Sequence, residues 1–315
     1  MTSNPSGIDI NANIFRAYDI RGVVTTDLRP DVVFLIGRAL ATLYPKCQQV
    51  VVGRDGRLSS QDLADQLIAG LRAGGTDVID VGEVPTPILY YATHALKTGS
   101  GLIVTGSHNP PEYNGIKMVM AEKTLFGDLI QEIFNCIQAN DFSTGNGTLE
   151  KIDIVDDYVS VISRDIKLQR PLKIAIDCGN GVAGPAALQL FAQLGCEITP
   201  LYCDVDGTFP NHHPNPSDPQ NLIDLITSVK ENKCDLGIAF DGDGDRCLII
   251  DNKGEILWPD RQMMVYSKNI LLKNKNKKIV FDVKSSKDLP IYISCLLYTS
   301  PSPRDVEESR MPSSA

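Results

Sequence analysis

The runs VVVG at residues 50–53 and GLIV at residues 101–104 are short and apolar at consecutive positions, as expected for strands buried on both faces. Between them lie a segment with helical periodicity at residues 60–72, a third strand-like run at residues 77–81 and a second helical segment at residues 87–96. Strands that alternate with helices in this way form mostly parallel sheets with helices on their faces. The sequence therefore predicts an α/β fold.

The same alternation continues in the second half of the chain. A polar stretch at residues 141–148 interrupts it, so we expect a linker near Lys151 and a new domain after it. The predicted elements that follow are helices at residues 155–166, 182–194 and 221–230 and strands at residues 172–176, 197–202 and 236–240. A third unit begins after Trp258, with a helix at residues 260–272 and a strand at residues 278–283. A single helix and a single strand have too little apolar surface to form a core of their own.

Residues 295–315 differ from the rest of the chain in composition. Serine and proline are frequent in them, which is typical of a disordered tail. The strings CLLYTSPSPRD and SRMPSSA within them also resemble in-frame translations of sequencing-library adapter DNA. We therefore interpret residues 295–315 as a non-native tail and leave them out of the fold prediction.

Composition limits the partners of the protein. A formal net charge of −9 over 315 residues argues against a nucleic-acid or anionic-membrane surface. No apolar run approaches the roughly 20 residues that a membrane helix needs, and residues 1–10 lack the core of a signal peptide. The eight cysteines are scattered without metal-binding spacing. We expect a cytoplasmic protein with no nucleic-acid and no membrane partner.

The hexapeptide TGSHNP at residues 105–110 directly follows the predicted strand at residues 101–104. Loops at the carboxyl ends of strands carry the active sites of open α/β sheets. A serine presented there, Ser107, can act as a nucleophile or carry a phosphate, and His108 beside it can transfer protons near neutral pH. Taken alone, the hexapeptide is equally consistent with an ordinary turn.

The hexapeptide DGDGDR at residues 241–246 also follows a predicted strand. Three carboxylates this close repel one another unless a cation lies between them, and hard oxygen ligands favour magnesium or calcium. An EF-hand loop would require glycine at its sixth position and glutamate at its twelfth, where this chain has Arg246 and Asn252. The EF-hand interpretation therefore fails, and a different divalent-cation site is favoured over an ordinary acidic surface turn. Its candidate ligands are Asp241, Asp243 and Asp245.

The run GNGVAG at residues 179–184 matches a dinucleotide-binding pattern locally. It lies between a predicted strand and a predicted helix, and Asp204 follows the next strand at about the distance of a ribose contact. The glycines can instead serve a tight turn and close packing. Further along, His212 and His213 lie among asparagines and prolines without a third metal ligand, so we expect a loop there.

Basic residues near these motifs have the chemistry to bind phosphate oxygens. They are Arg16, Arg21, Arg54, Arg57 and Lys117. Each of them taken singly is equally consistent with a solvated surface charge.

Three motifs in this order resemble those of the α-D-phosphohexomutases: FRAYDIRG at residues 15–22, TGSHNP at residues 105–110 and DGDGDR at residues 241–246. The resemblance covers about residues 14 to 288 and is closest to the bacterial phosphomannomutase/phosphoglucomutase branch. It implies consecutive three-layer α/β/α domains with mixed sheets, of which the third is incomplete and the fourth absent. The implied divisions are domain I at residues 1–153 with a phosphoserine loop, domain II at residues 154–257 with a metal-binding loop, a fragment of domain III at residues 258–294 and the tail at residues 295–315.

The resemblance implies an isomerase that interconverts hexose 1-phosphate and hexose 6-phosphate of mannose, glucose or both. Phosphate would pass through a phosphoserine and a bisphosphorylated sugar. One Mg²⁺ per subunit would be the cofactor, and glucose 1,6-bisphosphate or an equivalent sugar the phosphorylating activator. The partners would be hexose phosphates, and the protein would be a monomer or a weak dimer.

The resemblance also assigns roles to individual residues. Ser107 would carry the phosphate and complete the metal site of the three aspartates. Arg246 would stabilise the transferring phosphoryl group, and His108 and Lys117 are the candidates for proton transfer. The other residues expected at the reaction centre are Arg21, Tyr18, Asn109 and Lys284, the last from domain III.

Because the family's sugar-recognition loop and distal-phosphate loop would lie beyond this sequence, we expect the chain itself to have little mutase activity. Three other functions stay open. They are an NAD-dependent oxidoreductase that uses residues 179–184, a phosphoserine-type phosphatase that uses Ser107 and the same metal, and a non-catalytic sugar-phosphate-binding fragment.

Overall fold

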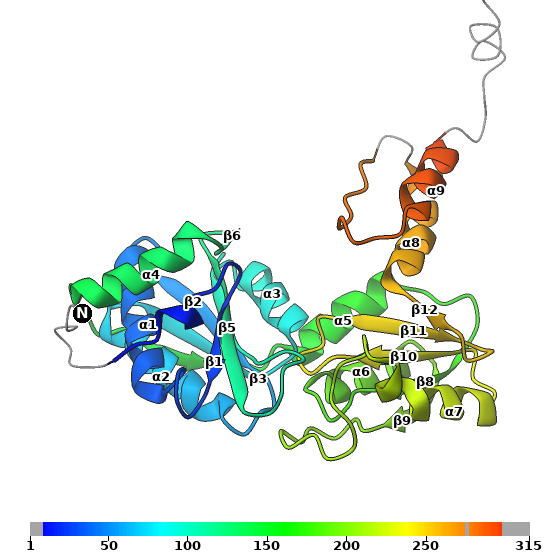
Figure 1. Cartoon of the computed structure of the whole chain (residues 1–315), viewed down its shortest axis with the longest axis horizontal. Coiled ribbons are helices and arrows are strands. Elements are labelled where there is room, and N and C mark those ends of the chain that lie inside the picture. Colours follow the sequence, from blue (N-terminus) through cyan, green and yellow to red (C-terminus); the bar gives the residue numbers. More distant parts are fainter. Residues whose placement is uncertain (1–8, 275–276, 298–315) are drawn as a thin grey trace, which may run out of the picture. The chain divides into compact units, whose positions relative to one another are not determined.

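The computed structural model describes residues 9–274 and 277–297 (Figure 1). The chain divides into two compact units, Met1–Gly254 and Glu255–Ala315. The first unit contains two sheets, each covered by helices. Both hexapeptides, at residues 105–110 and 241–246, belong to this unit.

The first sheet is mixed. Its strands lie in the order β1-β5-β4-β2-β3-β7, and β6 pairs with β5. Strands β4, β2, β3 and β7 run parallel, whereas β5 is antiparallel to both of its neighbours, β4 and β1. The bounds are β1 Ile20–Val23, β2 Gln49–Arg54, β3 Asp77–Glu83, β4 Gly101–Val104, β5 Tyr113–Met120, β6 Lys123–Thr124 and β7 Leu149–Lys151.

Helices cover both faces of this sheet, which explains why β2 is apolar at consecutive positions. Val50 and Val52 belong to one buried cluster together with apolar side chains of α1, α2 and α4. Val51 belongs to a second cluster together with side chains of α3, on the opposite face. The bounds are α1 Pro30–Leu43, α2 Ser60–Ala73, α3 Thr86–Ala95, α4 Asp128–Ala139 and α5 Val155–Asp165, with a short 3₁₀ helix at Ala12–Ile14.

The second sheet of the first unit is also mixed and mostly parallel. Its strands lie in the order β11-β10-β8-β9, and only β11 is antiparallel to its neighbour. The bounds are β8 Lys173–Asp177, β9 Glu197–Leu201, β10 Leu236–Phe240, β11 Cys247–Asp251, α6 Ala183–Gln193, α7 Ile223–Glu231 and a 3₁₀ helix at Pro219–Leu222. Residues 241–246 form the hairpin loop between β10 and β11. The predicted fold class, α/β with mixed sheets, is confirmed.

The second unit differs from the sequence prediction. It contains β12 (Ile256–Leu257), α8 (Pro259–Lys273) and α9 (Asp288–Leu297). The predicted strand at residues 278–283 is wrong: those residues pair with no strand in the described part of the chain. A strand needs a neighbour to satisfy its backbone groups, and β12 is the only other strand candidate in this unit that the structure describes. The first three residues of the expected tail, 295–297, belong to α9, and the others lie outside the described residues.

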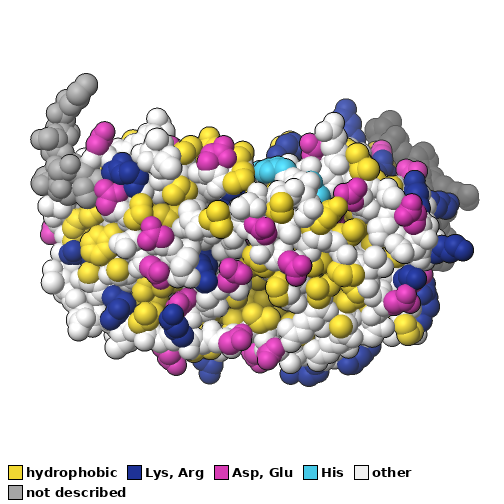
Figure 2. Space-filling view, turned by 90° about the horizontal axis from the view of Figure 1, so that it is seen from below, with side chains coloured by type: hydrophobic (Ala, Val, Ile, Leu, Met, Phe, Trp, Pro, Cys, Tyr) yellow, Lys and Arg dark blue, Asp and Glu magenta, His cyan; other side chains and the backbone are white. Residues whose placement is uncertain are grey.

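The expected linker near Lys151 is a strand instead. Leu149–Lys151 forms β7, which pairs parallel with the edge of β3 through Val78 and Leu149. The placement of the domain boundary at residues 153 and 154 stays a prediction. Among the residues described, no helix has the length and apolarity needed to cross a bilayer. Acidic and basic side chains are interspersed over the face drawn in Figure 2.

Candidate active site

The loop that carries Ser107 follows β4 and is strongly constrained. Ser107 is 3% exposed and has a φ of +50°, in the left-handed region that is costly for a residue with a Cβ. Its backbone N–H donates to Thr105 Oγ1 at 2.8 Å, and Thr105 Oγ1 in turn donates to Asp55 Oδ2 at 2.8 Å. The surrounding hydrogen bonds therefore hold the serine in a conformation that it would not adopt alone.

Arg57 is the main support of this loop. Its guanidinium pairs with Asp55 Oδ2 at 3.2 Å, and both side chains are 1% exposed. It also donates to three backbone carbonyls of the loop, those of Ser107 (2.9 Å), Asn109 (2.6 Å) and Pro110 (2.7 Å), and to the carbonyl of Tyr113 at the start of β5 (3.0 Å). Arg57 was a candidate phosphate ligand in the sequence, but its donors are committed to the protein backbone. It is a structural residue.

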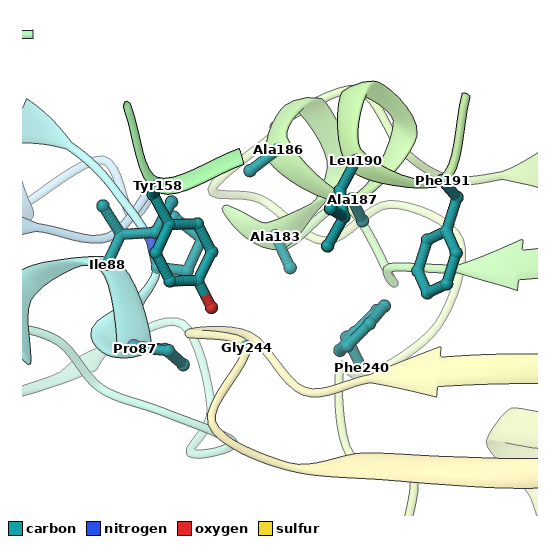
Figure 3. Close-up of a pocket in the computed structure, with 11 residues that line it drawn as sticks. Pro87, Ile88, Tyr158, Ala183, Ala186, Ala187, Leu190, Phe191, Phe240 and Gly244 are labelled. Atoms are coloured by element: carbon teal, nitrogen blue, oxygen red, sulfur yellow. The ribbon is translucent and has the colours of Figure 1, made fainter. Parts of the chain in front are cut away.

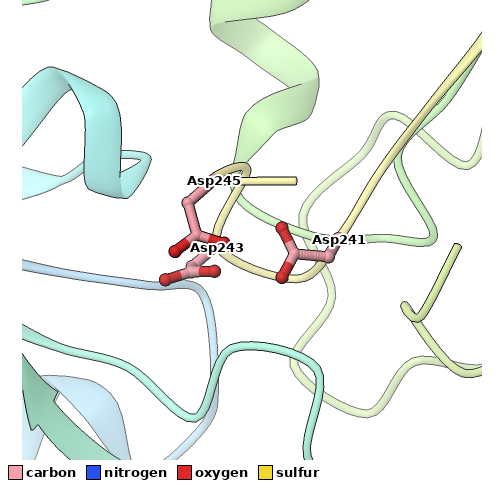
Figure 4. Close-up of side chains that lie close together, drawn as sticks. All are labelled: Asp241, Asp243 and Asp245. Carbon is pink, nitrogen blue, oxygen red and sulfur yellow. The ribbon is translucent and has the colours of Figure 1, made fainter. Parts of the chain in front are cut away.

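The three aspartates of the β10–β11 loop converge (Figure 4). One carboxylate oxygen from each of Asp241, Asp243 and Asp245 lies within 4.8 Å of the others. Asp241 and Asp243 are fully buried, whereas Asp245 is exposed. The turn closes because Gly244 adopts a φ of +70° and because Arg246 N donates to Asp241 Oδ1 at 3.0 Å.

The electrostatics of this cluster suit a cation. Burial, followed by the charges of Asp243 and Asp245, raises the pKa of Asp241 to about 7. Burial also opposes ionisation of Asp243, but the Lys117 ammonium at 2.5 Å outweighs it and lowers the pKa of that carboxyl. Asp243 Oδ1 is buried and receives no hydrogen bond from a nitrogen or hydroxyl donor among the described residues. An oxygen in that position requires a shared proton or a cation, so the donor set fits a divalent metal.

The serine loop and the aspartate loop touch. Ser107 Oγ donates to Asp241 Oδ2 at 3.0 Å and lies 3.3 Å from His108 Nδ1. The backbones also meet closely, because a Cβ on Gly242 would lie 2.4 Å from the carbonyl oxygen of Ser107. The arrangement places a buried hydroxyl directly beside the acidic cluster.

Other residues predicted for the site gather around these loops. Burial, followed by the charges of Arg246 and Arg21, lowers the pKa of His108 to about 4. Lys117 Nζ, on β5, contacts Asp243 Oδ2 at 2.5 Å and Asp245 Oδ2 at 2.6 Å. Burial alone would lower the pKa of Lys117, but these carboxylates raise it.

Two arginines complete the cationic side of the site. Arg246 Nε lies 3.9 Å from Asp241 Oδ2. Arg21 donates to Asn109 Oδ1 at 3.3 Å and to Asp19 Oδ2 at 2.5 Å. These contacts bring Arg246, Arg21 and Asn109 to the same pair of loops.

Among the described residues, no hydrogen bond or ion pair joins Tyr18 to these loops. Tyr18 is 80% exposed. Lys284 belongs to the second unit, so its predicted role stays a prediction.

Comparison with known proteins identifies the family. Models described as phosphoglucomutase/phosphomannomutase α/β/α domain I and domain II match residues 12–144 and 156–254. The chain belongs to the phosphoglucomutase/phosphomannomutase family. The predicted resemblance is thereby confirmed.

The relatives of this phosphoglucomutase/phosphomannomutase family member are longer than the chain. A phosphomannomutase/phosphoglucomutase of Pseudomonas aeruginosa is 50% identical over 285 residues, which cover 90% of this chain and 62% of that protein. A phosphoglucomutase of Neisseria meningitidis is 46% identical over 90% of this chain and 63% of its own length. The crystal structure of a family protein from Burkholderia thailandensis matches with a TM-score of 0.88 and 45% identity, covering 91% of this chain and 65% of that one. The chain thus spans under two thirds of each.

Thr86, which no sequence pattern predicts, also contacts the aspartate loop of this family member. Thr86 is fully buried at the start of α3. Its hydroxyl donates to Asp243 Oδ2 at 2.5 Å and its backbone N–H to the Asp243 carbonyl at 2.9 Å. A neutral residue 157 positions from its partner gives no charge or spacing signal, and only its place between Pro85 and Pro87 marks it.

An apolar pocket of about 120 Å³ adjoins the aspartate loop (Figure 3). It lies among α3, α5, α6 and the end of β10, and Gly244 forms part of its wall. Its other lining residues are Pro85, Pro87, Ile88, Tyr158, Ala183, Ala186, Ala187, Leu190, Phe191 and Phe240. Because this lining offers almost no hydrogen-bonding groups, the pocket does not suit a sugar phosphate.

The glycines of residues 179–184 are used for packing in this family member. A Cβ on Gly181 would lie 2.8 Å from the Gly242 carbonyl oxygen, and a Cβ on Gly184 would lie 1.9 Å from the Cys203 carbonyl oxygen. Val182 N, at the start of α6, already donates to the Gly242 carbonyl at 3.1 Å. These contacts support the structural interpretation of the run over dinucleotide binding. The loop predicted at His212 is confirmed, and His212 Nε2 there contacts Asp177 at 3.1 Å.

Proposed function

We propose that this chain carries the phosphoserine and metal portion of a phosphohexomutase active site, in which Ser107 passes phosphate to and from a hexose phosphate. One observation supports the proposal most directly: the buried Ser107 hydroxyl is hydrogen-bonded at 3.0 Å to Asp241 in the converging acidic cluster. The substrates would be hexose 1-phosphates and hexose 6-phosphates, because matched relatives are described as phosphomannomutases and phosphoglucomutases.

The transfer exchanges one P–O bond for another. The bond from phosphorus to Ser107 Oγ breaks as a bond to a sugar oxygen forms, and the sugar hydroxyl gives up its proton. His108 would hold a proton in this exchange, because its lowered pKa leaves the imidazole neutral at pH 7 and Nδ1 lies 3.3 Å from Ser107 Oγ. Arg246, 3.9 Å from Asp241, and Lys117, 2.5 Å from Asp243, would supply positive charge to the transferring phosphate.

Asp241, Asp243 and Asp245, with an oxygen on Ser107, would hold the metal. A divalent cation bound there neutralises charge on the phosphate. Burial of Ser107 also matters, because water admitted to the site would compete with the sugar hydroxyl as the acceptor of the phosphate.

The test is phosphopeptide mapping of the full chain after incubation with glucose 1,6-bisphosphate and Mg²⁺. We expect phosphate on Ser107 and its return to added hexose phosphate. Ser107→Ala should carry none, whereas Ser100→Ala, which removes a buried hydroxyl at the opposite end of β4, should be phosphorylated like the parent. Phosphate on another residue, or none, contradicts the proposal.

Two other functions give different products in the same experiment. A phosphatase releases inorganic phosphate from Ser107 and does not return it to a sugar. A non-catalytic sugar-phosphate-binding fragment binds the bisphosphate without labelling Ser107.

A further inference from the structure

We propose that Thr86 is a positioning residue for the metal site, and that it fixes the Asp243 carboxylate so that Oδ1 alone is available as a ligand. The inference rests on the proposed function of the three aspartates as a metal site. It adds a residue outside the aspartate loop and assigns the ligand oxygen.

Thr86 donates two hydrogen bonds to Asp243. The threonine hydroxyl donates to Oδ2 at 2.5 Å, and its N–H donates to the backbone carbonyl of the same aspartate at 2.9 Å. Thr86 itself is fully buried and lies between Pro85 and Pro87, which restrict its backbone. A rigid donor therefore meets both the main chain and the side chain of one acidic residue.

The two oxygens of Asp243 have different surroundings. Oδ2 accepts from Thr86 and also from Lys117 Nζ at 2.5 Å. Oδ1 is equally buried and has no nitrogen or hydroxyl donor among the described residues. One oxygen of Asp243 lies on the side of Asp241 (Figure 4). Since Oδ2 is occupied by two donors, Oδ1 is the oxygen left for a cation.

The hydroxyl of Thr86 determines which oxygen of Asp243 is left without a donor. The terminal torsion of an aspartate is broad, so a carboxylate with a single donor can rotate. Without the Thr86 hydroxyl only Lys117 would hold Oδ2, and Lys117 is shared with Asp245. Partners that orient metal ligands typically change metal affinity by about 10- to 100-fold when removed.

The experiment measures Mn²⁺ binding to the full chain by electron paramagnetic resonance of the free ion. Thr86→Val removes the hydroxyl and keeps the volume, and we expect its dissociation constant to rise about 10-fold or more. Thr86→Ser restores the hydroxyl and should bind within about two-fold of the parent. Thr93→Val is the matched control, because Thr93 is buried on the same helix and its hydroxyl donates to the Tyr90 carbonyl at 2.8 Å.

Stoichiometry separates weak binding from loss of folded protein. A higher dissociation constant at an unchanged number of sites supports the proposal, and Thr86→Ala gives the same comparison if the valine variant does not fold. Parent-like affinity in Thr86→Val, or equal weakening in Thr93→Val, overturns the role of Thr86 and leaves the metal site standing. Failure of the parent itself to bind Mn²⁺ overturns both this inference and the proposed metal site.

Discussion

Ser107 and Asp241 lie 134 positions apart in the sequence and are joined by a 3.0 Å hydrogen bond from the serine Oγ to the carboxylate Oδ2. Ser107 follows β4 of the first sheet, and Asp241 follows β10 of the second. Each therefore lies in a loop at the carboxyl end of its strand, where open α/β sheets place their functional groups. The site exists only while these two loops remain in contact.

Gly242→Ala tests that contact. The added Cβ would lie 2.4 Å from the Ser107 carbonyl oxygen, which is backbone and cannot move aside cheaply. We expect the loops to separate, a loss of about 1–3 kcal/mol in the free energy of unfolding, and at least 10-fold slower phosphorylation of Ser107. Denaturant unfolding and phosphopeptide mapping measure the two effects.

Gly195→Ala is the control for a glycine substitution away from the site. No atom of the residues that the structure describes lies within 4 Å of its Cβ position, and its φ of +81° imposes only local strain. We expect about 1–2 kcal/mol of destabilisation and unchanged phosphorylation of Ser107. Equal phosphorylation rates in the two variants would show that the loop contact is not needed.

Arg57→Met should strongly destabilise the protein. The substitution leaves the buried carboxylate of Asp55 without its ion pair and leaves loop carbonyls without donors. Breaking a buried pair by removing one partner typically costs about 3–5 kcal/mol. Urea unfolding measures this loss in the free energy of unfolding. Arg54→Met, at the end of β2, is the comparison, because no ion pair is found for Arg54 in the described residues. Equal midpoints for the two variants would contradict this role of Arg57.

Local pattern was enough to predict the central strands and the loops that follow them. The runs at residues 50–53, 101–104 and 236–240 are strands, and Ser107 and Asp241, in the loops after two of them, are hydrogen-bonded. Edge elements were not predicted: β7 has the composition of a linker and becomes a strand only because β3 offers it a free edge. The opposite error, at residues 278–283, arose because a strand-like run forms a strand only when it pairs with another strand, and these residues pair with none in the described part of the chain.

Supporting residues of the site could not be predicted from spacing. Arg57 has the chemistry of a phosphate ligand, and only the positions of four carbonyls show that it holds a loop instead. Thr86 carries no charge, and its partner Asp243 lies 157 positions away in the loop between β10 and β11. Both functions depend on tertiary contacts that no local pattern encodes.

Asp241→Asn should stabilise the protein in the absence of metal and abolish its stabilisation by Mg²⁺. At pH 8 without metal, the substitution removes a buried charge whose pKa is raised to about 7, so we expect a higher melting temperature than in the parent. This advantage should shrink as the pH falls through 7 toward 5, because the parent carboxyl then becomes protonated. With Mg²⁺ at 100 times its dissociation constant, the parent should gain about 2.7 kcal/mol and the variant none.

Differential scanning calorimetry with and without Mg²⁺ measures these shifts. Asp165→Asn, which changes an exposed carboxylate on α5, is the control and should respond to Mg²⁺ as the parent does. A variant of Asp241 that still gains stability from Mg²⁺ would remove this residue from the metal site.

His212 predicts a pH dependence of stability that is separate from the metal site. Burial disfavours its imidazolium, but the hydrogen bonds and charge of Asp177 at 3.1 Å outweigh burial and raise the pKa of His212. A raised folded pKa contributes stability that is fully present below the unfolded value of about 6.5 and is lost as the pH rises through the folded value. His212→Gln keeps a donor without the charge, so its melting temperature should fall below that of the parent at pH 6 and approach it at pH 9. His94→Gln, on the exposed side of α3, should show no such change, and a pH-independent deficit in His212→Gln would mean that His212 acts by packing alone.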